Sequence, residues 1–316
     1  MFPMLNTIFL ILSVVEFIIG ALGNAFIGLV NCSECIKNQK ISLVNFILTS
    51  LAISNVSQLL VALLDSFIMG LPPCLLLTNK LAKPITLLWR ITNHLITWLS
   101  TCLSIFYFLK IAHFSHCLFL WLKRRMNKVI PGILVFSSVF LVFDFLLLET
   151  FNDLFQNIAS ESNLTLDKNL YFKSLSLLSL TFFFPVILSL MSLLFLFLSL
   201  VKHTRNLKLN FVCSRDLSTQ AHKTAMKMVM SVFLLIMVHF FSVQLVNWLL
   251  FVYSDNEFIK FLMLAVYVFP SGHSFILILG SNKLRQRALK VLRHQKALKR
   301  ENPLPLQIRF QESFQR

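Results

Sequence analysis

The run IFLILSVVEFIIGALGNAFIGLV, from Ile8 to Val30, decides the fold class of this chain. Its single charged residue is Glu16, and it exceeds the roughly 20 mostly apolar residues that a helix needs to cross a bilayer. Six similar runs follow, each separated from the next by a polar segment. The runs are too long and too uniformly apolar for barrel strands, so the chain predicts an all-α bundle of seven transmembrane helices. The predicted spans are Ile8–Val30, Leu43–Met69, Pro84–Leu109, Val129–Leu148, Leu175–Val201, Met228–Tyr253 and Phe261–Ser281.

The composition excludes the other large classes of protein. Of 316 residues, 57% are hydrophobic and 13% are charged, against about 45–50% and about 25% in soluble proteins. The 33 Phe, with only seven Gly and nine Pro, exclude a collagen-like or disordered chain. We find no soluble domain or internal repeat. The expected organisation is a bundle over residues 1–281, followed by a basic tail over residues 282–316.

The charges predict the orientation of the bundle. The chain has 29 Lys and Arg against 13 Asp and Glu, a net charge of +16. Twenty-three of these cations, but only four of the acids, fall in the loops after spans one, three and five and in the tail, which gives that side about +19 and the other about −1. The positive-inside rule makes the basic side cytoplasmic, with the N-terminus outside and the first run retained as a span. The basic run after Asn282 directly follows a span, which favours a short amphipathic helix on the anionic inner leaflet over nucleic-acid binding.

Motifs for metal, cofactor or covalent chemistry are weak in this sequence. Cys32 and Cys35 form a lone C-x-x-C without a second ligand pair, so ordinary thiols are expected rather than a zinc site. The motifs of hydrolases, nucleotide-binding proteins and zinc proteases are absent, so we expect no enzyme and no cofactor. One modification motif is present: Asn163-Leu164-Thr165 is an N-glycosylation acceptor in a loop predicted to lie outside the cell.

Ionisable residues within the spans are costly and therefore suggest function. Asp65 and Arg90 fall at similar depth in the outer parts of spans two and three, where they either form an ion pair lining a cavity or reach to the interface. Asp144 is expected at the head-group boundary. Asn24 and Asn55 lie deeper in their spans and are expected to form hydrogen bonds between helices.

Polar and aromatic side chains also form faces on spans three and six. In span three they recur at spacings of three or four residues, which places them on one side of the helix, facing into the bundle. Aromatic walls with a few polar groups suit a small, mainly apolar ligand, although tryptophans in this position also form interfacial belts. The residues concerned are Trp89, Asn93, Thr97 and Ser100 in span three and Gln244, Asn247 and Trp248 in span six.

Long strings at the span ends carry a family resemblance. Span three ends without D-R-Y and span seven lacks N-P-x-x-Y, so the common rhodopsin-like motifs are missing. In their place stand NHLITWLSTCLSIFYFLKIAHFSH (Asn93–His116), SLLFLFLSLVKHTRNLKL (Ser192–Leu209), AHKTAMKMVMS (Ala221–Ser231) and HSFILILGSNKLRQ (His273–Gln286). These strings resemble the bitter taste receptors, the type 2 taste receptor family of G protein-coupled receptors, over almost the whole chain.

The resemblance implies a function and a set of site residues. A member of this family is expected at the plasma membrane, binding small bitter compounds in the outer bundle and activating a heterotrimeric G protein of the gustducin type. Trp89 and Asn93 match the family's ligand contacts, Asp65, Gln244 and Trp248 are weaker candidates, and Asn163 matches its glycosylation site. The residues that match its activation and G-protein-facing motifs are Tyr107, Lys110, His203, His222, Lys227, His273 and Ser274.

One departure and two alternatives stay open at this point. Many family members carry Arg in span two where this chain has Asn55, which puts in doubt the usual polar network linking spans one, two and seven. A type 1 vomeronasal-like chemoreceptor would share the topology, although the strings of spans three and seven disfavour it. A small-solute carrier is disfavoured because the seven spans show no repeat and no paired broken helices.

Overall fold

The described part of the chain is almost entirely helical. A computed structural model describes residues 2–39, 42–70, 78–112, 114–159, 164–209, 215–252 and 257–301. These residues form nine α-helices and no strand, so the predicted all-α fold is confirmed. The helices are α1 (Phe2–Asn38), α2 (Leu43–Gly70), α3 (Thr78–Ile111), α4 (Cys117–Arg124), α5 (Met126–Ala159), α6 (Leu164–Leu209), α7 (Arg215–Val252), α8 (Glu257–Gly280) and α9 (Asn282–Glu301).

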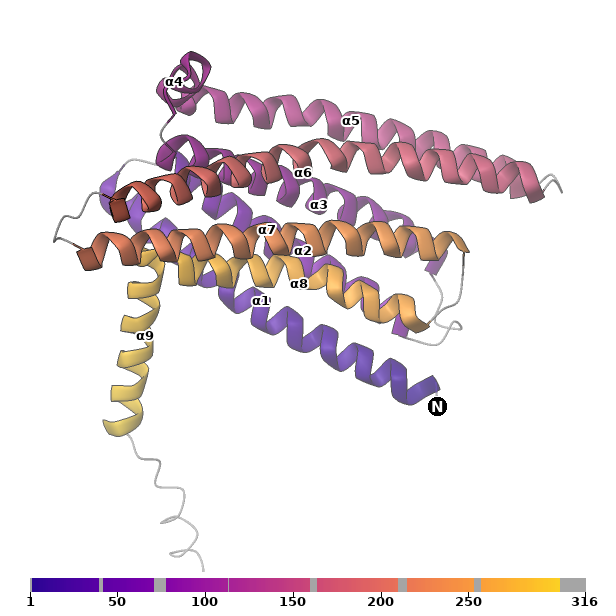
Figure 1. Cartoon of the computed structure of the whole chain (residues 1–316). Coiled ribbons are helices and arrows are strands. Elements are labelled where there is room, and N and C mark those ends of the chain that lie inside the picture. The colour runs from indigo at the N-terminus through magenta and orange to yellow at the C-terminus, as the bar shows by residue number, and fades with distance from the viewer. Residues whose placement is uncertain are drawn as a thin grey trace, which may run out of the picture.

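Seven of these helices are long and apolar enough to cross a membrane: α1, α2, α3, α5, α6, α7 and α8. They run side by side in one bundle, while α9 projects from one end (Figure 1). The short helix α4 lies at that same end, between α3 and α5. We call the end where the chain begins the N-terminal end and the opposite one the α9 end.

Helix α3 forms the centre of the bundle. It packs against α2, α5 and α6, and 67% of its most apolar stretch is buried inside the protein, against 17% for α1 and α5. The outward faces of α1 and α5 are nevertheless apolar, with exposed side chains such as Leu22, Leu29, Val135 and Val139. Apolar outer faces and a more polar inner helix are the arrangement expected when lipid, not water, surrounds the bundle.

Two clusters of buried apolar side chains hold the helices together. The larger one extends from the middle of the bundle to the α9 end and includes Leu51, Leu103 and Leu196. The smaller one lies at the N-terminal end and joins α2, α7 and α8 through Ala62, Val246 and Tyr267. Helix α1 also approaches α2 and α8 closely at Gly20. A Cβ atom added to this residue would lie within 2.6 Å of Leu59 and 2.9 Å of Ser271.

The helices extend beyond the predicted spans. Residues 149–174 were expected to form a loop, but α5 continues to Ala159 and α6 begins at Leu164. Apolarity marks only the part of a helix inside the lipid, so a span prediction misses helical turns that continue into the polar region. Helix α4 was not predicted, and α9 is longer than the predicted tail helix, with 20 residues. The placement of α9 on a membrane surface stays a prediction.

A polar network joins α1, α2 and α8 near mid-bundle. The Asn55 amide donates to the Asn24 side-chain oxygen at 2.9 Å, and the Asn24 amide donates to the backbone oxygens of Gly20 at 2.8 Å and Pro270 at 3.2 Å. Both asparagines are fully buried. The predicted hydrogen bonds between helices are therefore confirmed. Although many family members have Arg at this position, Asn55 takes part in a polar network that links α1, α2 and α8.

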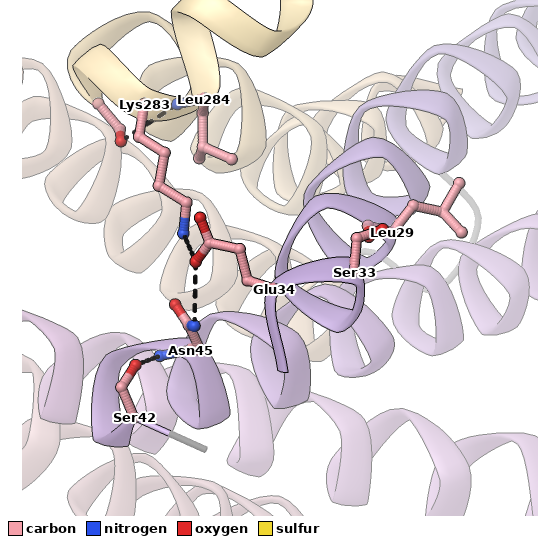
Figure 2. A network of polar contacts seen from close by, with 8 residues as sticks. Leu29, Ser33, Glu34, Ser42, Asn45, Lys283 and Leu284 are labelled. Carbon is pink, nitrogen blue, oxygen red and sulfur yellow. Dashed lines mark hydrogen bonds and ion pairs between the residues drawn. The ribbon is translucent and has the colours of Figure 1, made fainter. Parts of the chain in front are cut away.

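Helix α9 is fixed to the bundle through its first turn (Figure 2). The Lys283 ammonium bonds the Glu34 carboxylate on α1, which also accepts a hydrogen bond from the Asn45 amide on α2 at 3.3 Å. Beside this ion pair the Leu284 side chain is 2% exposed and belongs to the larger apolar cluster. The first turn of α9 thus contacts α1 directly and reaches α2 through Glu34, while the rest of α9 extends away from the bundle.

Candidate functional site

A cavity of about 210 Å³ lies at the N-terminal end of the bundle. Four helices contribute to its wall, so a molecule inside it would touch α2, α3, α7 and α8 together. Its lining is mainly apolar and aromatic, with one acidic and one basic side chain. The lining residues are Asp65, Ile85, Thr86, Trp89, Arg90, Val243, Val246, Met263, Val266 and Tyr267.

The first turns of α3 supply the largest part of this wall. Ile85 and Trp89 are four residues apart, so they lie one above the other on the same face of the helix. Asn93 follows one turn deeper on that face and is 2% exposed; it is not among the residues that line the cavity. The structure therefore brings Trp89 to the cavity itself and places Asn93 below it.

Asp65 and Tyr267 form the polar part of the wall. The Tyr267 hydroxyl on α8 donates to Asp65 Oδ2 on α2 at 3.0 Å and lies 3.6 Å from the sulfur of Met263. Arg90 is half-buried and lines the same cavity. The expectation that Asp65 and Arg90 line one cavity is therefore met. Their direct ion pair and the outward position of this cavity stay predictions, and the observed donor to Asp65 is Tyr267.

Sequence reasoning missed the contribution of α8. Tyr267, Met263 and Val266 recur at spacings of three and four, which places them on one helical face. The chain has four Tyr in all, and a Tyr inside an apolar span carries a hydroxyl that needs a partner when buried. That signal could have pointed to Tyr267, but only the tertiary structure identifies Asp65 as the partner.

The predicted residues of span six lie differently from expectation. Val243 and Val246 line the cavity. Successive residues of an α-helix are rotated by about 100° around the helix axis. Seen along that axis, Gln244 points about 130°, and Trp248 about 170°, away from the direction midway between the two valines. Trp248 is 51% exposed, as expected for an outward-facing tryptophan of an interfacial belt. We therefore leave Trp248 out of the site. Gln244 is not among the residues that line the cavity. The side chain of Asn247 lies outside the described residues.

Asp144 is a correction to the sequence analysis. It was expected at the head-group boundary, but it is 3% exposed and lies inside the bundle, with one carboxylate oxygen 3.9 Å from His94 Nδ1 on α3. His94 packs against Trp98, whose ring contacts Phe140 and Phe184. Pairing with His94 offsets part of the cost of burying a carboxylate.

Helix α8 connects the cavity to the interior of the bundle. Just beyond Tyr267, the Pro270 carbonyl accepts a hydrogen bond from Asn24, and the Ser271 hydroxyl donates to Glu16 on α1 at 2.9 Å. One turn further, His273 stacks on Phe269, which in turn contacts His239 of α7 with ring centroids 4.3 Å apart. A displacement of α8 at the cavity would therefore alter contacts with α1 and α7.

The residues predicted to act in activation fall into two groups. His273 and Ser274 are fully buried in α8, so neither forms part of a docking surface. Tyr107 is half-buried at the α9 end of α3, and Lys110 and Lys227 are exposed at that end. His203 and His222 belong to α6 and α7, but their side chains lie outside the described residues, as does Asn163.

The arrangement suits reversible binding. Apolar and aromatic walls supply contact area, while Asp65, Arg90 and the Tyr267 hydroxyl supply a few oriented polar groups. Among the described residues, no group of three or more His, Cys, Asp or Glu could hold a metal ion.

Comparisons with known proteins agree with the family resemblance of the sequence. A family model described as taste receptor protein (TAS2R) matches residues 1–296. Taste receptor type 2 member 42 of Pongo pygmaeus is 60% identical over 310 residues, which cover 96% of this chain and 99% of that protein. The human member 42 is 59% identical with the same coverage, and taste receptor type 2 member 7 of Pongo pygmaeus is 43% identical over 295 residues, covering 91% and 93%. The resemblance drawn from the sequence strings, which includes a likeness to member 42, is confirmed.

Proposed function

The chain belongs to the taste receptor type 2 family, the bitter taste receptors, and from this premise we propose that it binds small bitter compounds in the cavity at its N-terminal end. The observation that carries the proposal is the cavity itself, because four helices meet there around Trp89 and the Asp65–Tyr267 pair. Family membership is that of a multi-pass membrane receptor rather than an enzyme. We further propose a plasma-membrane location, with the N-terminus outside.

The mechanism is a shift between two packings of the same bundle. A ligand that fits the cavity better in one packing shifts the population towards it by its difference in affinity for the two. Tyr267 and the residues that follow it on α8 link the cavity to α1 through Asn24 and Glu16, and to α7 through the His239–Phe269–His273 stack. In the active packing, the α9 end engages a heterotrimeric G protein of the gustducin type.

Several residues take part in this proposal beyond the cavity lining. Asn93 lies below the cavity and would contact a ligand that reaches deeper, whereas Gln244 would act from outside the lining. The buried His273 and Ser274 would act within the α7–α8 contact, because they cannot reach a partner protein. Tyr107, Lys110, His203, His222 and Lys227 remain the proposed G-protein-facing group, and Asn163 the proposed glycosylation site.

The ligand site is tested by paired tryptophan variants in a calcium-response screen of bitter compounds. Trp89→Ala should raise the half-maximal agonist concentration by about tenfold or more, because truncating a central aromatic anchor typically costs that much affinity. Trp248→Ala is the matched control, since this tryptophan lies on the outward side of α7 and should leave the response unchanged. Surface expression is measured for each variant.

Opposite results would reject the site. If Trp89→Ala and Asn93→Ala left the response to every agonist unchanged at equal surface expression, ligand would bind elsewhere.

The G protein is tested separately in cells that lack endogenous Gα subunits. Adding back a gustducin-type subunit should restore the response, and an equal response without any added subunit would contradict the proposed coupling.

A further inference from the structure

A second hollow lies at the α9 end, outside the helix contacts described so far. It is a groove of about 550 Å³ formed by the first turn of α2, the last turns of α3 and the first turn of α5. It lies at the opposite end of the bundle from the ligand cavity and shares no lining residue with it. Its lining is Ser42, Leu43, Val44, Phe46, Phe106, Lys110, Met126 and Asn127.

The groove combines apolar walls with one cation. Phe46 lines it from α2 and is 48% exposed, and Phe106 lines it from α3. The exposed Lys110 extends over the Phe106 ring, with its ammonium nitrogen 5.3 Å from the ring centroid. No acidic side chain is among the lining residues, and within the described part of the chain Lys110 has no carboxylate partner. Among the described residues, no carboxylate neutralises the positive charge of this groove.

Two helices begin at this groove, and the start of a helix carries a partial positive charge. At the start of α2, Ser42 already accepts from the N–H groups of Asn45 and Phe46, and at the start of α5 the Arg125 carbonyl accepts from Lys128 and Val129. The earlier N–H groups of a helix have no acceptor within it. In these two helices they belong to Leu43, Val44, Met126 and Asn127, and all four residues line the groove.

We propose that this groove binds one anionic phospholipid of the cytoplasmic leaflet. The lipid phosphate lies beside Lys110 and the first turns of α2 and α5, and an acyl chain follows Phe46 and Phe106 towards the middle of the membrane. Charge complementarity supports this occupant, because 23 of the 29 Lys and Arg fall in the loops and tail predicted to be cytoplasmic and the inner leaflet is anionic. A groove between membrane-spanning helices, apolar on one side and cationic on the other, matches a phospholipid in both parts.

Native mass spectrometry of the full-length purified receptor tests the headgroup part of this proposal. Phosphatidylserine and phosphatidylcholine with identical acyl chains are added at equal concentration, and the retained lipids are counted. Lys110→Gln should lower the affinity for the first phosphatidylserine by about fivefold, the contribution of one lysine near an anionic surface, and leave phosphatidylcholine binding unchanged. Lys202→Gln, an exposed lysine of α6 outside the groove, is the control and should change neither.

A pair of phenylalanine variants on α2 tests the acyl-chain part. Phe46→Ala should weaken retention of both lipids, whereas Phe67→Ala, at a comparably exposed position near the other end of α2 (39%), should not. Thermal unfolding of each variant establishes that it is folded.

Three results would overturn the proposal. If Lys110→Gln and Lys202→Gln lowered the affinity for phosphatidylserine equally, Lys110 would act only through general surface charge. Competition by glycerophosphoserine, which lacks acyl chains, as strong as by the lipid would identify a phosphate site instead. Impaired G-protein activation by Lys110→Gln together with an unchanged affinity for phosphatidylserine would assign Lys110 to the protein partner alone. The lipid-binding readouts need no bitter agonist, so their outcome is independent of the proposed ligand site.

Discussion

The two ends of the bundle are built on different principles. At the N-terminal end, a small apolar cluster surrounds a cavity whose wall includes Asp65 and Tyr267. From mid-bundle to the α9 end, a much larger cluster packs the helices together beside the groove of α2, α3 and α5, and α9 is fixed to this cluster by Leu284 and the Lys283–Glu34 pair. One end thus leaves room for a ligand, and the other holds the helices in a defined arrangement.

The difference matters because packing and binding place opposite demands on a protein interior. Well-filled interiors lose stability when a side chain is enlarged or truncated, whereas a binding site must leave part of its volume empty until a ligand arrives. In lipid the contrast is sharper, because helix association depends on close contact and interhelical hydrogen bonds rather than on exclusion of water. Substitutions should therefore act on stability at one end and on ligand response at the other.

Truncating a side chain in the larger cluster should have the greatest effect on stability. Leu196→Ala removes a fully buried side chain on α6 and should lower the free energy of unfolding by about 2–5 kcal/mol. Leu249→Ala, in the smaller cluster beside the cavity, should cost less because its surroundings can relax into existing space. Thermal unfolding of both purified variants measures the difference in stability between them. Equal losses of stability would contradict the contrast between the two ends of the bundle.

Enlarging two valines on the same helix separates packing from binding. Val232→Phe, in the larger cluster, should cost about 1–3 kcal/mol of stability because this buried side chain is surrounded by others that would have to move. Val246→Phe, which lines the cavity, should cost less and should instead block the response to agonists. The measurements are thermal unfolding and calcium response at matched surface expression. A full agonist response in Val246→Phe would show that the ligand does not enter this cavity.

Removing the link between α1, α2 and α8 should have an intermediate effect on stability. Asn24→Ala eliminates the bonds to Asn55 and to the Pro270 carbonyl, which should cost about 1 kcal/mol, the scale of interhelical hydrogen bonds in membranes. Ser57→Ala is the control, because this exposed hydroxyl bonds only its own helix at Ile53. If both variants unfolded at the same temperature as the parent chain, the network would contribute nothing measurable.

The smallest effect is expected at the ion pair of α9. Lys283 and Glu34 are partly exposed, so breaking their contact should cost about 1 kcal/mol or less. A double-mutant cycle with Lys283→Met and Glu34→Gln isolates this coupling energy, and added salt should reduce it. Leu284→Ala should loosen α9 more strongly, since this side chain is buried. A spin label placed on α9 reports both changes, and a larger release in Lys283→Met than in Leu284→Ala would reverse this ranking.

The parts of the site that could be predicted are those that depend on one helix at a time. Helical spacing identified the face of α3 that carries Trp89, and intramembrane charge singled out Asp65 and Arg90. Predictions that needed a second helix were less successful. The choice for Trp248 between a ligand site and the interfacial belt stayed open, Asp144 was not recognised as a buried neighbour of His94, and Tyr267 was missed. Sequence spacing does not state which face of a helix meets which neighbour.

The sequence by itself determined that this chain is a seven-helix membrane receptor. Apolar length and the cost of exposing backbone to lipid leave few other structures, and the strings at the span ends specify the family. The tertiary structure decided where space is left between the helices. It brought Asp65 to Tyr267 across 202 positions of sequence and aligned the starts of α2 and α5 along one groove. Such pairings depend on the rotation and depth of each helix in the bundle, and these are fixed only when all the helices pack together.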